Sequence, residues 1–409
     1  MRRKPVNGRA RAAAWSIAAA MLLYTPAPIW AQTSVLVARD TAPLWGYDAW
    51  QIDSDPIVSI GVADGPEEQI LVNVFAAGVL SDGTIVVVDF RQGFFKVRYY
   101  DDAGLHLVSV GSWGGGPGET RSLAGAHFLP GDSLLVLGYD RRFTVFGPRG
   151  QVGRTGLIPG SAFMTGATIL DGTRLAMDVS DQDNGSLPER PELRRVQRGF
   201  RILDTLTGER IWVEQFPGKY YYRTSWGTVP YPFSPSVWTA AGRGHLWVGQ
   251  SEVGSIQGYN RAGRHQVTIE AGRAASSVTD EHQRRYVELV LDGLSGDRLR
   301  RMETALRYVD FPRTLPHFRA LSVDADGNLW VLRYSLPWHR DLPRWDVYNY
   351  AGRWLTSVAQ PATIPVRFRS ASEQTGTVKD LLDIGRNYVL AIVHDDMGVQ
   401  RVQLHKMRR

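Results

Sequence analysis

Histidine side chains are the first candidates for metal or ligand binding in this sequence. Nine histidines are scattered over 409 residues, without the H-E-x-x-H spacing that places two of them on one helix face. The lack of cysteine excludes a cysteine-based zinc site. His127 and His317 each stand near the start of an apolar strand pattern, so a repeat fold can bring them together. We treat both as candidate ligand-binding residues; packed or surface histidines are the alternative.

Two cations occupy nearly equivalent positions in the repeats described below. Arg319 and Lys379 both fall on strands that we expect to lie at the inner side of their repeats. A register error of one residue would reverse the facing of either side chain. If the two side chains point into a channel, they favour an anionic ligand there. Pairing with acids of neighbouring repeats is the alternative.

Aromatic residues gather in one segment, KYYYRTSWGTVPYPF, at residues 219–233. Tyr222, Trp226 and Tyr231 are candidates for a rim that stacks on a sugar ring or holds a peptide, because aromatic residues are enriched at binding surfaces. A loop that packs on its own domain is the alternative.

Two further motifs suggest chemistry but fit turns better. The loop GSWGGGPGET at 111–120 lacks the Lys that a phosphate-binding loop of the Walker type requires. The run VDADGN contains Asp324, Asp326 and Asn328, but its glycine is misplaced for an EF-hand calcium loop. We expect an inter-repeat loop and a hairpin turn, with calcium as the alternative at the second. No G-x-S-x-G motif of serine hydrolases occurs.

Internal repeats must position all of these side chains. Each unit has an apolar strand, a turn such as Asp82-Gly83, two more strands and a second glycine-containing turn. Six units are recognisable, and the clearest spans 74–104. The others include 127–150, 167–208 with an insertion, 237–263, 321–352 with an insertion, and 381–407.

A meander of about four strands is one blade of a β-propeller. The sequence therefore predicts an all-β, six-bladed propeller over residues 32–409. The last unit has only three strands, and Pro56–Gly61 reads as a lone strand. We expect this N-terminal strand to complete the last blade and remove a free sheet edge.

One insertion, at about 276–310, has helical periodicity. Thr279 or Ser277 can cap its start, and Gly293 and Gly296 interrupt it. We expect two short helices that lie over the propeller.

The repeats resemble those of secreted six-bladed propellers related to NHL-repeat proteins. The resemblance rests on the repeat unit, on the loop at 111–120 and on FPRTLPHFRALSVDADGNLWV at 311–331, and it covers nearly all of residues 32–409. It implies a fold rather than an activity, since propellers host enzymes, receptors and scaffolds.

The N-terminus predicts export. Residues 1–31 run from basic to apolar to a small residue, Ala31, which is the order of a signal peptide; a retained membrane anchor is the alternative. Removing them takes away five basic and no acidic residues, and leaves 42 Lys and Arg against 41 Asp and Glu. The net charge of +6 thus falls to +1, which gives no electrostatic reason to expect nucleic acid. We expect a periplasmic or extracellular protein without a further membrane span.

The sequence favours a binding module over an enzyme. We expect a protein, peptide or carbohydrate partner at the channel mouth and no required cofactor. The alternative is a lactonase-like hydrolase or lyase with a divalent metal in the channel; the sequence contains no catalytic signature that decides between them.

Overall fold

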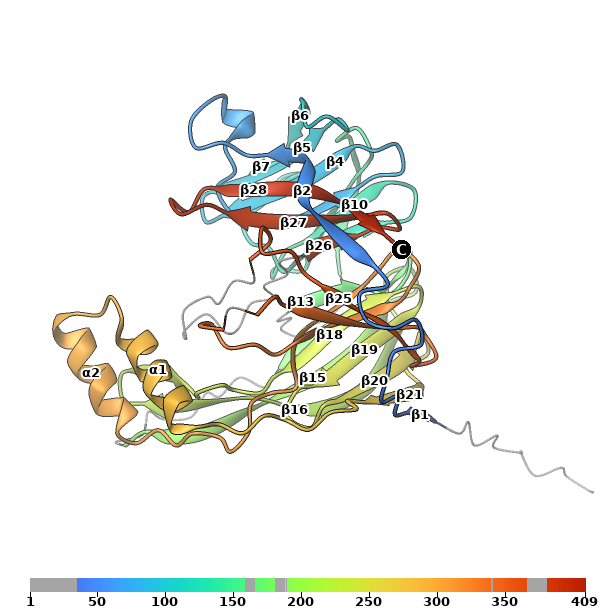
Figure 1. Ribbon diagram of the computed structural model, residues 1–409. Coiled ribbons are helices and arrows are strands. Elements are labelled where there is room, and N and C mark those ends of the chain that lie inside the picture. The colour runs from blue at the N-terminus through green and yellow to red at the C-terminus, as the bar shows by residue number, and fades with distance from the viewer. Residues whose placement is uncertain (1–34, 159–165, 181–187, 189, 340, 366–380) are drawn as a thin grey trace, which may run out of the picture. The chain divides into compact units, whose positions relative to one another are not determined.

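The structure, a computed structural model, describes residues 35–158, 166–180, 188, 190–339, 341–365 and 381–409. The predicted signal peptide and Lys379 lie outside these residues. The described chain is all-β apart from two α-helices and one short 3-10 turn (Figure 1). Its strands form six sheets of four or five strands and one two-stranded ladder.

The sheets follow the repeat units along the chain, and we number them in that order. The first contains β3 (Val74–Val79), β4 (Ile85–Arg91), β5 (Phe94–Tyr100) and β6 (His106–Val110); the second, β9 (Gly125–Leu129), β10 (Ser133–Leu137), β11 (Arg142–Phe146) and β12 (Val152–Leu157). The third contains β13 (Gly166–Ile169), β14 (Arg174–Ser180), β15 (Glu192–Asp204), β16 (Arg210–Thr224) and β17 (Gly227–Pro230).

The remaining three sheets complete the set. The fourth contains β18 (Val237–Gly242), β19 (His245–Gln250), β20 (Ser255–Asn260), β21 (His265–Glu270) and the N-terminal β1 (Leu36–Ala38). The fifth contains β22 (Phe318–Val323), β23 (Leu329–Arg333), β24 (Arg344–Tyr348) and β25 (Trp354–Ala359); the sixth, β26 (Leu381–Ile384), β27 (Tyr388–His394), β28 (Gln400–Arg408) and β2 (Gln51–Ile60). A 3-10 turn (Glu67–Gln69) lies between β2 and β3, and β7 (Ser112–Trp113) and β8 (Glu119–Thr120) lie between β6 and β9.

The recurring second turn has the same local cause in the first, fourth and fifth sheets. In the first sheet, the carboxylate of Asp101 accepts hydrogen bonds from the backbone N–H groups two and four residues later, at 3.0 and 2.8 Å. Asn260 and Asn349 do the same in the fourth and fifth sheets. Each turn also needs a residue with positive φ, for example Gly104 at +84°. This is why the motif recurs so clearly in the sequence.

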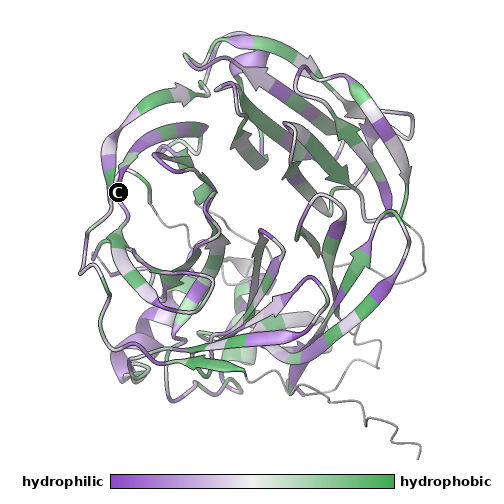
Figure 2. Cartoon of the chain, turned by 90° about the vertical axis from the view of Figure 1, so that its right-hand side faces the viewer, coloured by the Kyte–Doolittle hydropathy of each residue, from purple (hydrophilic) through white to green (hydrophobic). Residues whose placement is uncertain are grey.

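Buried side chains join each sheet to the next. Figure 2 shows hydrophobic and hydrophilic stretches alternating along the strands. Six hydrophobic clusters connect the first sheet to the second, and so on to the sixth, and the sixth to the first. Representative members are Val88 and Leu134, Leu137 and Leu203, Phe200 and Leu246, Val267 and Leu329, Trp330 and Val389, and Leu390 and Val87.

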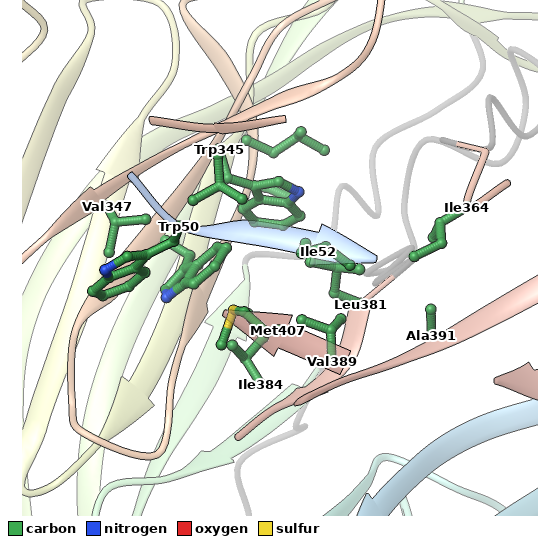
Figure 3. Packing of buried hydrophobic residues seen from close by; sticks show 14 of the residues in the cluster. Trp50, Ile52, Trp345, Val347, Ile364, Leu381, Ile384, Val389, Ala391 and Met407 are labelled. Atoms are coloured by element: carbon green, nitrogen blue, oxygen red, sulfur yellow. The ribbon is translucent and has the colours of Figure 1, made fainter. Parts of the chain in front are cut away.

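The cluster between the fifth and sixth sheets is rich in tryptophan (Figure 3). The ring of Trp330 lies 5.9 Å from that of Trp50 and 6.2 Å from that of Trp345, measured between centroids. The indole N–H of Trp345 donates to the side-chain oxygen of Gln360 at 2.8 Å, so this buried polar atom has a partner.

The N-terminal segment pairs with three sheets in turn. β1 pairs in parallel with β21 of the fourth sheet, an addition that the sequence reasoning missed. The backbone N–H groups of Leu44 and Trp45 then donate to carbonyls of the fifth sheet, both at 2.9 Å. β2 pairs antiparallel with β28 of the sixth sheet, with Ile60 opposite Val402. The predicted pairing of Pro56–Gly61 with the last unit is therefore confirmed.

The two predicted helices are present as α1 (Asp280–Leu291) and α2 (Gly296–Leu306). Thr279 caps α1 and forms a reciprocal capping box with His282. Gly293, with φ of +69°, lies in the break between the helices. Both helices pack on side chains from around β16, β17 and the fifth sheet.

Candidate functional site

One cavity of about 130 Å³ lies between the fourth and fifth sheets. Its walls come from β20, β21 and the segment after it, from all four strands of the fifth sheet or their ends, and from the N-terminal segment. The lining residues are Thr41, Tyr47, Gly254, Ile256, Ile269, Ala271, Gly272, Arg273, His317, Phe318, Val331, Arg333, Asp346, Tyr348 and Trp354.

A buried carboxylate organises the polar wall. Arg333 donates to Asp346 through two hydrogen bonds, Nε to Oδ2 at 2.9 Å and a terminal nitrogen to Oδ1 at 2.7 Å. The same guanidinium donates to the hydroxyl oxygen of Ser357 at 3.0 Å, and this hydroxyl in turn bonds to Asp346. Two parallel bonds hold the planar guanidinium rigidly. Arg333 is thus a fixed cation at the end of β23.

A second guanidinium faces the same carboxylate. Arg273 follows β21 and contacts Oδ2 of Asp346 at 3.5 Å. Burial lowers the pKa of Arg273, and the charge of Arg333 lowers it further. The pKa of His317 is likewise lowered, first by burial and then by Arg273. The wall therefore carries two arginines, one carboxylate and an imidazole that is mainly neutral at pH 7.

The rest of the lining is mainly apolar. Ile256, Ile269, Phe318 and Val331 are buried, and the rings of Tyr348 and Trp354 stack with centroids 6.3 Å apart. Tyr47 adds a ring from the N-terminal segment, edge-on to Trp354 at 5.9 Å.

A glycine shapes one end of the cavity. Gly254 has φ of +68°, and a Cβ atom there would lie 2.7 Å from Nδ1 of His317. Only glycine suits both the backbone conformation and this approach.

The structure places the predicted site residues in separate regions. His317 lines the cavity, and Arg319 lies two residues further, on β22. His127 lies on β9 of the second sheet, opposite Leu135. His127 and His317 therefore belong to different sheets and do not share this cavity.

The aromatic segment packs against the helical insertion. Tyr222 is 3 % exposed, and its hydroxyl oxygen accepts a hydrogen bond from the backbone N–H of Asp310 at 2.8 Å. Tyr231 packs on Tyr222 with centroids 6.0 Å apart, and burial raises its pKa to about 12. Both join a cluster with Ala305 of α2, whereas Trp226 at the β16–β17 turn remains 40 % exposed.

The two motifs interpreted as turns have internal partners. Glu119 accepts hydrogen bonds from the N–H of Gly116 at 2.8 Å and from Ser112 at 3.1 Å, which closes the glycine-rich loop. Asp324 accepts from two backbone N–H groups of its own turn and pairs with Arg409 at 2.8 Å. Among the described residues, no three His, Asp or Glu side chains are arranged to hold a metal ion.

Sequence reasoning missed Arg273, Arg333 and Asp346. Arg333 and Asp346 each place a charge inside an otherwise apolar strand, in WVLRY and RWDVY. Because a charged residue is seldom fully buried unless it is paired, this pattern could have indicated a buried ion pair. Arg273 has no such signal, because it stands in a polar segment after β21.

Comparisons with known proteins show likeness in structure only. No protein family and no curated protein matches the sequence. A Bacteroides fragilis protein described as exported is 10% identical, with a TM-score of 0.45 over 92% of this chain and 99% of that one. A DUF4221 family member from Bacteroides vulgatus is 10% identical, with a TM-score of 0.47 over 88% and 99%.

A luciferin-regenerating enzyme is 11% identical, with a TM-score of 0.40 over 87% of this chain and 96% of that one. At these scores none of the three carries an argument about function. Within the described part of the chain, neither helix is long and apolar enough to cross a membrane.

Proposed function

We propose that this chain is an exported six-bladed β-propeller, related to NHL-repeat proteins, that binds a small ligand between its fourth and fifth blades. The six inter-sheet clusters support closure, since they connect the sheets in cyclic order. The pairing of β2 with β28 supports it as well, because the sixth sheet gains its fourth strand from the N-terminus. Residues 1–31 support export, because a basic region is followed by an apolar stretch and then by the small residue Ala31.

The cavity between the fourth and fifth sheets carries the proposal of a binding role. It combines apolar walls with a few convergent polar groups, which is typical of small-molecule sites. His317, one of the predicted ligand-binding residues, contributes to it. This combination favours the cavity over a channel mouth as the ligand site.

Ligand-observed NMR with a mixed set of small neutral, anionic and cationic fragments tests the proposal. The protein is residues 32–409. We expect some fragments to bind, and Ala271→Phe to abolish their binding by filling the cavity. Ala262→Phe, in the exposed turn between β20 and β21, is the matched control and should bind as the parent does. Absence of binding, or binding that Ala271→Phe leaves unchanged, would refute a ligand site here.

A further inference from the structure

We infer that the cavity selects small organic acids with an apolar body, and that Arg273 holds the carboxylate beside the Arg333–Asp346 pair. This inference rests on the proposed binding function and specifies its ligand. The charges of the described lining residues give the first reason. Two guanidinium groups share the single carboxylate of Asp346. One positive charge in the cavity therefore has no matching anion among the lining residues.

The neighbouring charges do not cancel this excess. Asp40 lies beside the cavity, accepts a hydrogen bond from the backbone N–H of Trp354, and pairs with Arg353 at 3.2 Å. His317 is mainly neutral at pH 7, because its pKa is lowered. The excess positive charge therefore remains with the two lining arginines.

Arg273 is the guanidinium better able to engage a ligand. Arg333 is already committed to Asp346 and Ser357 by three hydrogen bonds. Arg273 reaches Asp346 only at 3.5 Å, and its side chain is 42 % exposed. A guanidinium has five N–H donors in a planar fork that matches a carboxylate. A bound carboxylate can thus engage Arg273 without breaking the Arg333–Asp346 pair.

The size and the apolar wall define the rest of the ligand. A volume of about 130 Å³ is close to that of an apolar cavity of ~150 Å³ that admits benzene. Ile256, Ile269 and Val331 offer aliphatic contact, and Tyr348 and Trp354 offer ring contact. A ring-sized body therefore fits beside the arginines.

Isothermal titration of residues 32–409 with benzoate, and with its neutral analogue benzyl alcohol, tests the inference. We expect benzoate to bind at least about tenfold more tightly, since a charge-assisted bond is lost with the alcohol. Arg273→Gln should weaken benzoate about tenfold and leave benzyl alcohol unchanged. Arg273→Lys should be intermediate, because it keeps the charge and loses the fork. Arg264→Gln, in an exposed turn, is the matched control.

The outcomes separate the inference from the proposed function. If benzoate and benzyl alcohol bind equally tightly, and Ala271→Phe abolishes their binding whereas Arg273→Gln does not, the cavity binds ligands but does not select acids. If inorganic phosphate binds as tightly as benzoate, the apolar body contributes nothing and this part of the inference is wrong. If neither benzoate nor benzyl alcohol binds while other fragments do, the acid preference is refuted and the binding role stands. If no fragment binds at all, both proposals are refuted.

Discussion

Arg98 and Asp89 form an ion pair in the first sheet from which water is almost excluded. The nitrogen and oxygen atoms lie 2.6 Å apart, and the side chains are 2 % and 0 % exposed. Asp89 also accepts hydrogen bonds from the backbone N–H groups of Val72 and Asn73, at 3.0 and 2.7 Å. The carboxylate thus joins the start of β3 to the centre of its sheet.

Asp89→Ala should therefore lower the free energy of unfolding by about 3–5 kcal/mol, because it leaves the Arg98 charge buried and unpaired. Urea denaturation measures this loss. Asp140→Ala removes the exposed partner of Arg142 and serves as the control, with an expected loss below about 1 kcal/mol. Equal losses in the two variants would contradict the role given to burial.

Removal of residues 32–61 should unfold or aggregate the protein. The deletion takes away β2, which leaves β28 as an open edge, and the contacts of the N-terminal segment with the fourth and fifth sheets. Thermal unfolding of proteins that begin at residue 32 and at residue 62 provides the comparison. An unchanged melting temperature in the shorter protein would refute this role of β2.

Gly78→Ala should destabilise the contact between the first and second sheets. A Cβ atom at this position would lie 2.5 Å from the ring of Phe128, closer than real Cβ contacts allow. We expect a loss of about 1–3 kcal/mol in urea denaturation, the usual cost of overpacking. Gly115→Ala has no atom within 4 Å of the added carbon and should change little. A Gly78→Ala protein as stable as this control would show that Phe128 can move aside freely.

Truncation of Tyr222 and of Trp226 should have different effects on stability. Tyr222→Ala removes a buried ring and the hydroxyl that accepts from Asp310, and should cost about 3–5 kcal/mol. Trp226→Ala removes a ring that is 40 % exposed, and should stay within about 0.5 kcal/mol. Chemical denaturation of both variants decides whether this segment is a packing element. Similar, small effects would favour a free binding rim instead.

Acid should destabilise the protein through His405. This imidazole is fully buried, its Nδ1 lies 3.0 Å from the carbonyl oxygen of Asp53, and burial lowers its pKa. As the pH falls, the unfolded chain is therefore protonated first. The stability contribution is complete above about pH 6.5 and decreases as the pH falls toward the lowered pKa.

Unfolding midpoints at about pH 7.5 and about pH 5.5 measure this effect. His405→Asn keeps a donor near the position of Nδ1 and removes the titrating group, so its midpoint should fall less between the two pH values. An equal fall in parent and His405→Asn would assign the effect to other groups.

Local chemistry explains which elements could be predicted from the sequence. Turns such as Asp101–Gly104 and the cap at Thr279 depend on side chains within four residues of each other, so their signals are visible in the chain. The partner of β2 could be predicted as well, because the last repeat unit has only three strands and a propeller blade has about four.

The cavity could not be predicted, because its geometry is entirely tertiary. Arg273, Arg333 and Asp346 come from three segments, and only the packing of two sheets brings their charges together. His317 is the one sequence candidate among the lining residues, and the glycine that it adjoins, Gly254, is 63 residues earlier in the chain. β1 has only three residues and no counterpart in the repeats, so no sequence pattern indicated that it forms a strand.

The pairing of β2 with β28 has a consequence for how the chain matures. Ser59 and Gln403, which bond across this pair, are separated by 344 positions in the sequence. A ribosome releases β2 long before its partner β28. β2 must therefore stay unpaired while the residues between the two strands emerge, and the sixth sheet can form only after β28 has been made. Formation of this sheet is then the step at which a chaperone that shields bare strand edges would act.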